Sequence, residues 1–133
     1  MAKTRIYTND LYVLALEFTF KVPNQAWLQE QNLKLIADTL KKPLKEMDGR
    51  FHKALSNFTD MHILVICSVP YTKSPAEVAQ VLKKVASQRV KDEDPSLASL
   101  YFGSQLFVTG YKVRNPKWST VPGYKVVDQG SEF

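Results

Sequence analysis

The clearest hydrophobic pattern in the chain is a strict alternation near the N-terminus. Apolar side chains occupy every second position there, at Tyr12, Leu14, Leu16, Phe18, Phe20 and Val22. This period of two is typical of a β-strand. The positions between them begin apolar and become polar from Glu17 onward. The pattern therefore predicts a central strand that is buried on both faces at its start and on one face toward its end, with Pro23 and Asn24 ending it.

The spacing of apolar residues then changes to that of a helix. Leucine and isoleucine recur at intervals of three and four, at Leu33, Ile36, Leu40 and Leu44. The helix is predicted to begin at Gln25, with Asn24 as its N-cap. Proline lacks the backbone N–H that a helix interior requires, so Pro43 is expected to end or kink the helix near Lys41 and Lys42.

Two more strands and a second helix follow. Strands are predicted over residues 50–58 and 61–69, the latter being the most apolar stretch of the chain. Ser74 and Glu77 form a capping box with Pro75 at the first helical position, which predicts a helix reaching about Val90. A last strand is predicted over residues 105–114. The residues after this strand show no sustained periodicity of apolar positions.

The order strand, helix, strand, strand, helix, strand predicts an α+β protein with the ferredoxin-like split βαβ arrangement. Four antiparallel strands would carry two helices on one face. We expect one domain over residues 1–114 and an irregular tail over residues 115–133.

Composition narrows the class of protein. A length of 133 residues suits one globular domain. The single cysteine, Cys67, excludes an internal disulfide and the paired-cysteine metal sites found in some proteins of this shape. No stretch reaches the roughly 18 apolar residues of a membrane span, so a cytoplasmic protein is expected. The net charge of +5 favours a polyanionic partner without defining a site.

The strand over residues 61–69 carries the first candidate site. Met61, Ile63, Val65, Cys67 and Val69 alternate onto an apolar face, which must be the face that the helices cover. Asp60 and His62 point to the opposite face. Side chains two apart on a strand project side by side, as two ligands of one cation do. The alternative is a turn aspartate beside a half-buried histidine.

Three segments resemble the small single-tyrosine transposases of the HUH class, which mobilise insertion sequences as single-stranded DNA. They are TDMHILVICSVP (59–70), SPAEVAQVLKKVASQRV (74–90) and DPSLASLYFGSQLFVTGYKV (94–113). The family's counterparts are an acid-led His-hydrophobic-His strand, a capped helix, a Pro-x-Leu segment and a strand with Gly-Tyr-x-Val. In the family, the two histidines hold a divalent metal that polarises the scissile phosphate.

This sequence departs from the family at its catalytic positions. Asp60 replaces the first histidine and His62 matches the second, which implies weak Mg²⁺ or Mn²⁺ binding completed by water. The family carries its catalytic tyrosine on a helix after the Gly-Tyr-x-Val strand. Here Tyr124 follows Pro122 and Gly123, where no helix is predicted, so the nucleophile is unassigned. Tyr111 matches the strand tyrosine and is expected to pack in the fold.

The resemblance implies single-stranded or hairpin DNA as partner, and a homodimer. The candidate phosphate contacts are Lys83, Lys84, Arg89, Lys112 and Arg114, with Tyr101 or Phe102 stacking on bases. The second strand and residues 100–107 would supply the dimer surface. Three functions follow: a transposase-like single-strand binding protein with lost or altered catalysis, an active metal-dependent nicking and strand-transfer enzyme, or a dimerisation module without nucleic acid.

Overall fold

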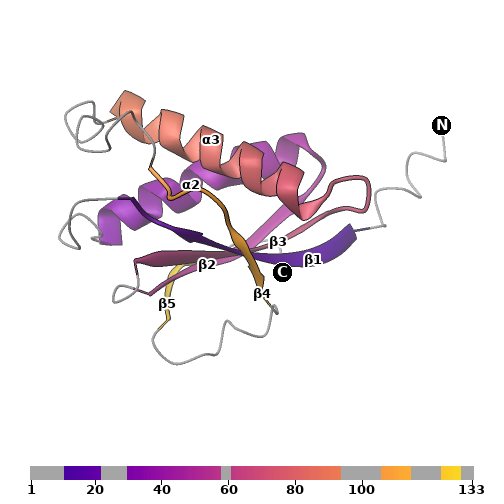
Figure 1. Cartoon of the computed structure of the whole chain (residues 1–133), viewed down its shortest axis with the longest axis horizontal. Helices are drawn as coiled ribbons and strands as arrows, with labels where there is room; N and C mark the ends of the chain where they lie inside the picture. Colours follow the sequence, from indigo (N-terminus) through magenta and orange to yellow (C-terminus); the bar gives the residue numbers. More distant parts are fainter. Residues whose placement is uncertain (1–10, 22–29, 58–60, 94–105, 115–123, 130–133) are drawn as a thin grey trace.

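A computed structural model describes residues 11–21, 30–57, 61–93, 106–114 and 124–129. The described elements are β1 (Leu11–Thr19), α2 (Glu30–Glu46), β2 (Arg50–Asn57), β3 (His62–Pro70), α3 (Pro75–Glu93), β4 (Lys112–Arg114) and β5 (Lys125–Gln129). The strands form one antiparallel sheet in the order β4-β1-β3-β2-β5. Figure 1 shows both helices on the same face of this sheet. The chain is therefore an α+β protein, as the sequence predicts.

The main core lies between the sheet and the two helices. The alternating apolar positions of β1 and β3 pack there against the helical stripes, which include Leu33, Ile36, Leu40, Val78 and Leu82. The assignment of sheet faces is thus confirmed for β3, because Ile63 and Val65 belong to this core. Cys67 is part of it, and burial raises the pKa of its thiol to about 12. This cysteine is a core residue, not a reactive one.

The predicted start of the second helix is confirmed in atomic detail. The Glu77 N–H donates to the Ser74 hydroxyl and the Ser74 N–H donates to the Glu77 carboxylate, each at 3.1 Å. These two bonds satisfy backbone donors that the first turn of a helix otherwise leaves unpaired.

The predicted end of the first helix is wrong. The helix α2 continues through Pro43 to Glu46, whereas the sequence pattern predicted that it would end or kink near Lys41 and Lys42; a kink there stays a prediction. The following Leu44 is fully buried in the core, and its burial favours one more helical turn despite the hydrogen bond that proline removes. The predicted N-cap Asn24 and the helix start at Gln25 lie outside the described residues.

The sheet has five strands in the described part of the chain, not four. The strand β5 comes from the region predicted to be an irregular tail, and it pairs with β2. The strand β4 is also shorter than predicted, because among the described residues 106–111 only Phe107 joins the sheet, in an isolated bridge to Phe20. A salt bridge of 2.9 Å between Lys41 and Asp128 ties β5 to α2. The strand β5 is only five residues long, which is too short for its pattern of apolar and polar positions to identify it from the sequence.

This arrangement changes the surfaces expected to form a homodimer. The strand β2 lies inside the sheet, between β3 and β5, so its edge is already paired. Leu106 and Phe107 are buried in the core of the monomer. Residues 100–105 of the expected dimer surface lie outside the described residues, and a homodimer stays a prediction.

The face of the sheet opposite the helices carries a second, smaller apolar cluster. Ala15, Leu55, Leu64 and Ile66 are buried there, and the half-buried ring of Tyr124 packs against them. This face is therefore a packed surface on which a polar group can be shielded from water. In the described ranges, no helix is both long and apolar enough to cross a membrane.

Candidate functional site

A buried carboxylate lies at the centre of the helix-free face. Glu17 of β1 has only 3% of its surface exposed. Its Oε1 accepts a hydrogen bond of 2.9 Å from Nη2 of Arg114 on β4, and its Oε2 accepts one of 2.5 Å from the Tyr124 hydroxyl. Nδ1 of His62 lies 3.4 Å from the same Oε2. We call these four residues the Glu17 centre.

The pairing register explains why these residues meet. On β3, His62 stands opposite Thr19, two positions from Glu17 on the same face of β1. On β4, Arg114 stands opposite Ala15, two positions away in the other direction. Diagonal neighbours on adjacent strands are within reach of long side chains. The sheet therefore aims an imidazole and a guanidinium at one carboxylate from both sides.

The surroundings of Glu17 keep it ionised. Burial raises its pKa, but hydrogen bonds from Tyr124 and Arg114, together with the charges of His62 and Arg114, outweigh this and leave the pKa below its ordinary value. The centre therefore holds a carboxylate that balances the charge of Arg114 and accepts a hydrogen bond from the Tyr124 hydroxyl. Sequence reasoning noted Glu17 only as a polar position. Its signal was an acidic residue inside an alternating apolar strand.

The predicted metal site is only partly described. Asp60 lies outside the described residues, and His62 faces Glu17. No group of three or more His, Cys, Asp or Glu side chains suited to a metal occurs among the residues with a described position. Both carboxylate oxygens of Glu17 already accept hydrogen bonds. The described residues thus fit an ion-pair centre better than a Mg²⁺ or Mn²⁺ site, and weak metal binding by Asp60 and His62 stays a prediction.

The predicted phosphate-binding lysine Lys83 has a structural role. Its ammonium group donates to the carbonyl oxygens of Val108 at 3.0 Å and Gly110 at 2.9 Å. Desolvation lowers the pKa of this lysine. Because Gly110 lies two residues before β4, Lys83 joins α3 to the chain that enters β4. Figure 1 shows this chain running from the helix layer to the outer edge of the sheet.

The other predicted phosphate contacts fall into two groups. Lys84 and Lys112 are exposed and form no ion pair within the described part of the chain. Arg89 pairs with Glu93 at 3.2 Å, and Arg114 pairs with Glu17. The structure thus brings Lys83, Lys112 and Arg114 to the β4 edge. Arg89 borders a groove between α2 and α3 that Lys84 and Gln88 also line.

One aromatic residue at this edge is only partly covered by the fold. Tyr111, expected to pack in the fold, has 38% of its surface exposed beside Lys112. An exposed ring next to a cation is a platform on which a base can stack. The other aromatic candidates, Tyr101 and Phe102, lie outside the described residues.

Comparison with known proteins adds a likeness of fold. No protein-family model matches the chain, and no curated protein does. Among solved structures, a putative transposase from Deinococcus radiodurans superimposes with a TM-score of 0.62 at 19% sequence identity. The match covers 79% of this chain and 78% of that chain. The chain therefore has a transposase-like α+β fold, and the chemistry must be argued from its own residues.

Proposed function

We propose that the protein binds single-stranded nucleic acid along the β4 edge, as a transposase-like protein whose strand-cleaving chemistry is lost or altered. The observation that carries this proposal is the contact of Lys83 with Val108 and Gly110. It holds the chain before β4 against α3, next to the exposed Lys112 and the exposed ring of Tyr111. A cation and an aromatic ring at one sheet edge suit a phosphate and a base of a flexible strand.

The proposal that cleavage is lost or altered rests on the contacts within the Glu17 centre. The guanidinium of Arg114 is bonded to Glu17 and the Tyr124 hydroxyl is bonded to the same carboxylate. In this arrangement the guanidinium and the hydroxyl are both engaged by Glu17 rather than by a phosphate. The replacement of the first family histidine by Asp60 points the same way. Binding without cleavage is the function that these contacts support best.

The test is fluorescence anisotropy with a labelled hairpin carrying a single-stranded flank, at a series of salt concentrations. Each phosphate contact made to a single strand contributes about 0.7 to the slope of log affinity against log salt. We expect Lys112→Gln to reduce this slope by about that amount, whereas the matched variant Lys34→Gln, an exposed lysine on α2, retains it. Absence of binding at low salt would leave the dimerisation module as the better function.

Strand cleavage through Tyr124 is the second candidate, and one contact favours it. The Tyr124 hydroxyl donates to the ionised Glu17 at 2.5 Å, so the carboxylate is placed to remove the phenolic proton. The phenolate oxygen would attack the phosphorus, and the bond from phosphorus to the leaving strand oxygen would break as that oxygen takes a proton from water. The product would be a strand joined covalently to Tyr124.

This candidate is tested with a labelled hairpin substrate, Mg²⁺ or Mn²⁺, and denaturing gels. Active cleavage would give a protein-linked strand with the wild type and none with Tyr124→Phe. Tyr111→Phe is the matched control, because it removes a hydroxyl from an exposed tyrosine outside the Glu17 centre. We expect no adduct with any of the three proteins, in keeping with a binding function. An adduct that depends on Tyr124 would reverse the order of the two candidates.

A further inference from the structure

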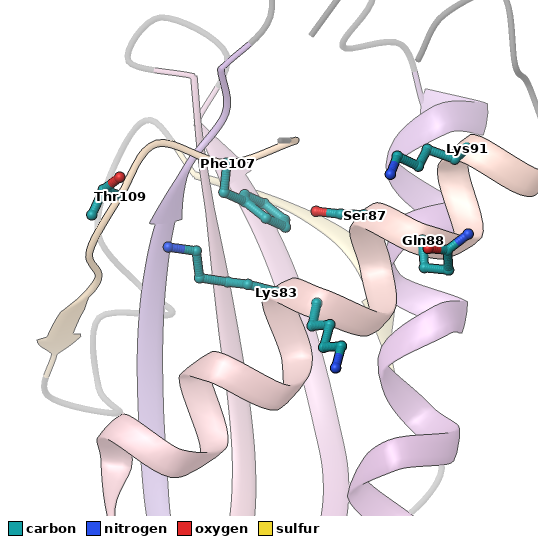
Figure 2. Close-up of a pocket in the computed structure, with 7 residues that line it drawn as sticks. Lys83, Ser87, Gln88, Lys91, Phe107 and Thr109 are labelled. Carbon is teal, nitrogen blue, oxygen red and sulfur yellow. The ribbon is translucent and has the colours of Figure 1, made fainter. Parts of the chain in front are cut away.

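A polar groove lies between α3 and the segment 106–110, on the helix side of the β4 edge. It has a volume of about 400 Å³ and is lined by Lys83, Lys84, Ser87, Gln88, Lys91, Phe107 and Thr109. We call it the α3 groove. Figure 2 shows Lys83 extending from α3 toward the segment that carries Phe107 and Thr109. This contact forms one wall of the groove.

The charge of the groove has one sign. Three lysines line it, and none of the lining residues that the structure describes is acidic. Lys83 is held in place by the carbonyl oxygens of Val108 and Gly110. Lys84 and Lys91 form no ion pair among the described residues, so their charges are available to a ligand. An anion bound here would offset positive charges that have no ion-pair partner among the residues the structure describes.

The hydrogen-bonding groups of the groove suit the same ligand. Oγ of Ser87 accepts a bond of 3.4 Å from the Leu106 N–H, which leaves the hydroxyl proton free to be donated. Ser87 follows Lys84 by three positions and Lys91 follows it by seven, so the three side chains lie along one side of α3. Two helical turns separate the two lysines by about 10.5 Å along the axis. This spacing suits separate charges on an extended ligand better than one small anion.

We propose that the α3 groove binds the phosphodiester backbone of a single-stranded nucleic acid. Lys84 and Lys91 each contact a phosphate, and Ser87 donates a hydrogen bond to one of them. This inference rests on the proposed function and adds a second contact region to it. A strand that passes Lys112 and Tyr111 continues around the segment 106–110 into the groove. Lys91 and Ser87 thereby join the binding surface, and Arg89, paired with Glu93, leaves it.

The experiment compares two double variants that lose the same charge. Lys84→Gln with Lys91→Gln removes the groove lysines, and Lys34→Gln with Lys45→Gln removes two exposed lysines from α2. Strand binding is measured by anisotropy across salt concentrations. We expect the groove variant to lower the salt slope by about 1.4, which is two contacts at about 0.7 each, and to weaken binding at low salt about tenfold. The α2 variant should retain the wild-type slope. Thermal melting of both variants checks that each is folded.

The outcomes separate this inference from the proposed function. If the wild type does not bind the strand at low salt, both fail. If it binds and the two double variants behave alike, the groove assignment alone is overturned. Inorganic phosphate is titrated separately to distinguish a free phosphate from a strand as the ligand. Tight phosphate binding that is lost in the groove variant, with strand affinity unchanged, would overturn the assignment of the groove to a nucleic-acid backbone.

Discussion

Glu17→Ala is expected to lower the free energy of unfolding by about 3 kcal/mol, because breaking a buried ion pair leaves the partner charge uncompensated. The guanidinium of Arg114 loses its carboxylate, and the Tyr124 hydroxyl loses the acceptor that holds it to the sheet. Arg114 retains some contact with water, since its side chain is 27% exposed, which keeps the loss at the lower end for such pairs. Urea denaturation followed by tryptophan fluorescence or circular dichroism measures the effect.

The matched control is Glu77→Ala, which removes a fully exposed carboxylate from the capping box of α3. Its effect should be much smaller, because water replaces the lost contacts. Equal losses for the two variants would contradict a buried structural role for Glu17.

The stabilisation by Glu17 should also depend on pH. The pKa of Glu17 is lowered in the folded protein from its ordinary value of 4.5, so the folded state binds the proton less readily than the unfolded state does. Its contribution is therefore fully present above pH 4.5 and is lost as the pH falls through the lower pKa of the folded state. The difference in stability between the wild type and Glu17→Gln should shrink in that acidic range. A difference that stays constant down to strongly acidic pH would argue against an ionised Glu17.

Deletion of residues 124–133 is expected to destabilise the protein by about 4 kcal/mol or more, from lost apolar burial and lost hydrogen bonds. It removes the β5 ladder along β2 and the ring of Tyr124 that packs against Leu55 and Leu64. It also leaves Glu17 without the Tyr124 hydroxyl and Lys41 without Asp128.

Deletion of residues 130–133 alone is the control, and it should leave thermal stability close to that of the full chain. The melting temperatures of the three proteins, measured by circular dichroism, decide the matter. If both deletions melted with the full chain, β5 would contribute nothing to the folded state.

Much of the helix-covered core could be predicted from the sequence because its signals are local. The alternation in β1 and the three-and-four spacing of α2 each report burial on one side of a single element. The capping box is complete within four consecutive residues, so Ser74 and Glu77 defined the start of α3 without any tertiary information. Pro43 did not end α2, because the burial of Leu44 in the core offsets the hydrogen bond that proline removes.

The candidate site could be predicted only in part, because its members are joined by long-range pairing. His62 was identified from its strand, but Glu17 and Tyr124 are 107 positions apart in the chain and meet through one hydrogen bond. The family resemblance suggested Lys83 and Arg114 as phosphate contacts, yet it could not show that both are held by protein groups. A role for the exposed Lys84 and the partly buried Lys91 could be proposed only once the structure placed them in one groove.

The sequence by itself determined the α+β class, the order of the first six elements and the side of β3 that faces the helices. These features follow from periodicity, capping and proline placement, which act over one or two helical turns or a few strand residues. Only the tertiary structure decided that residues 125–129 form a fifth strand and that Glu17 gathers His62, Arg114 and Tyr124. A short edge strand and a buried carboxylate depend on partners brought from distant parts of the chain, and the free energy of those contacts has no counterpart in any local pattern.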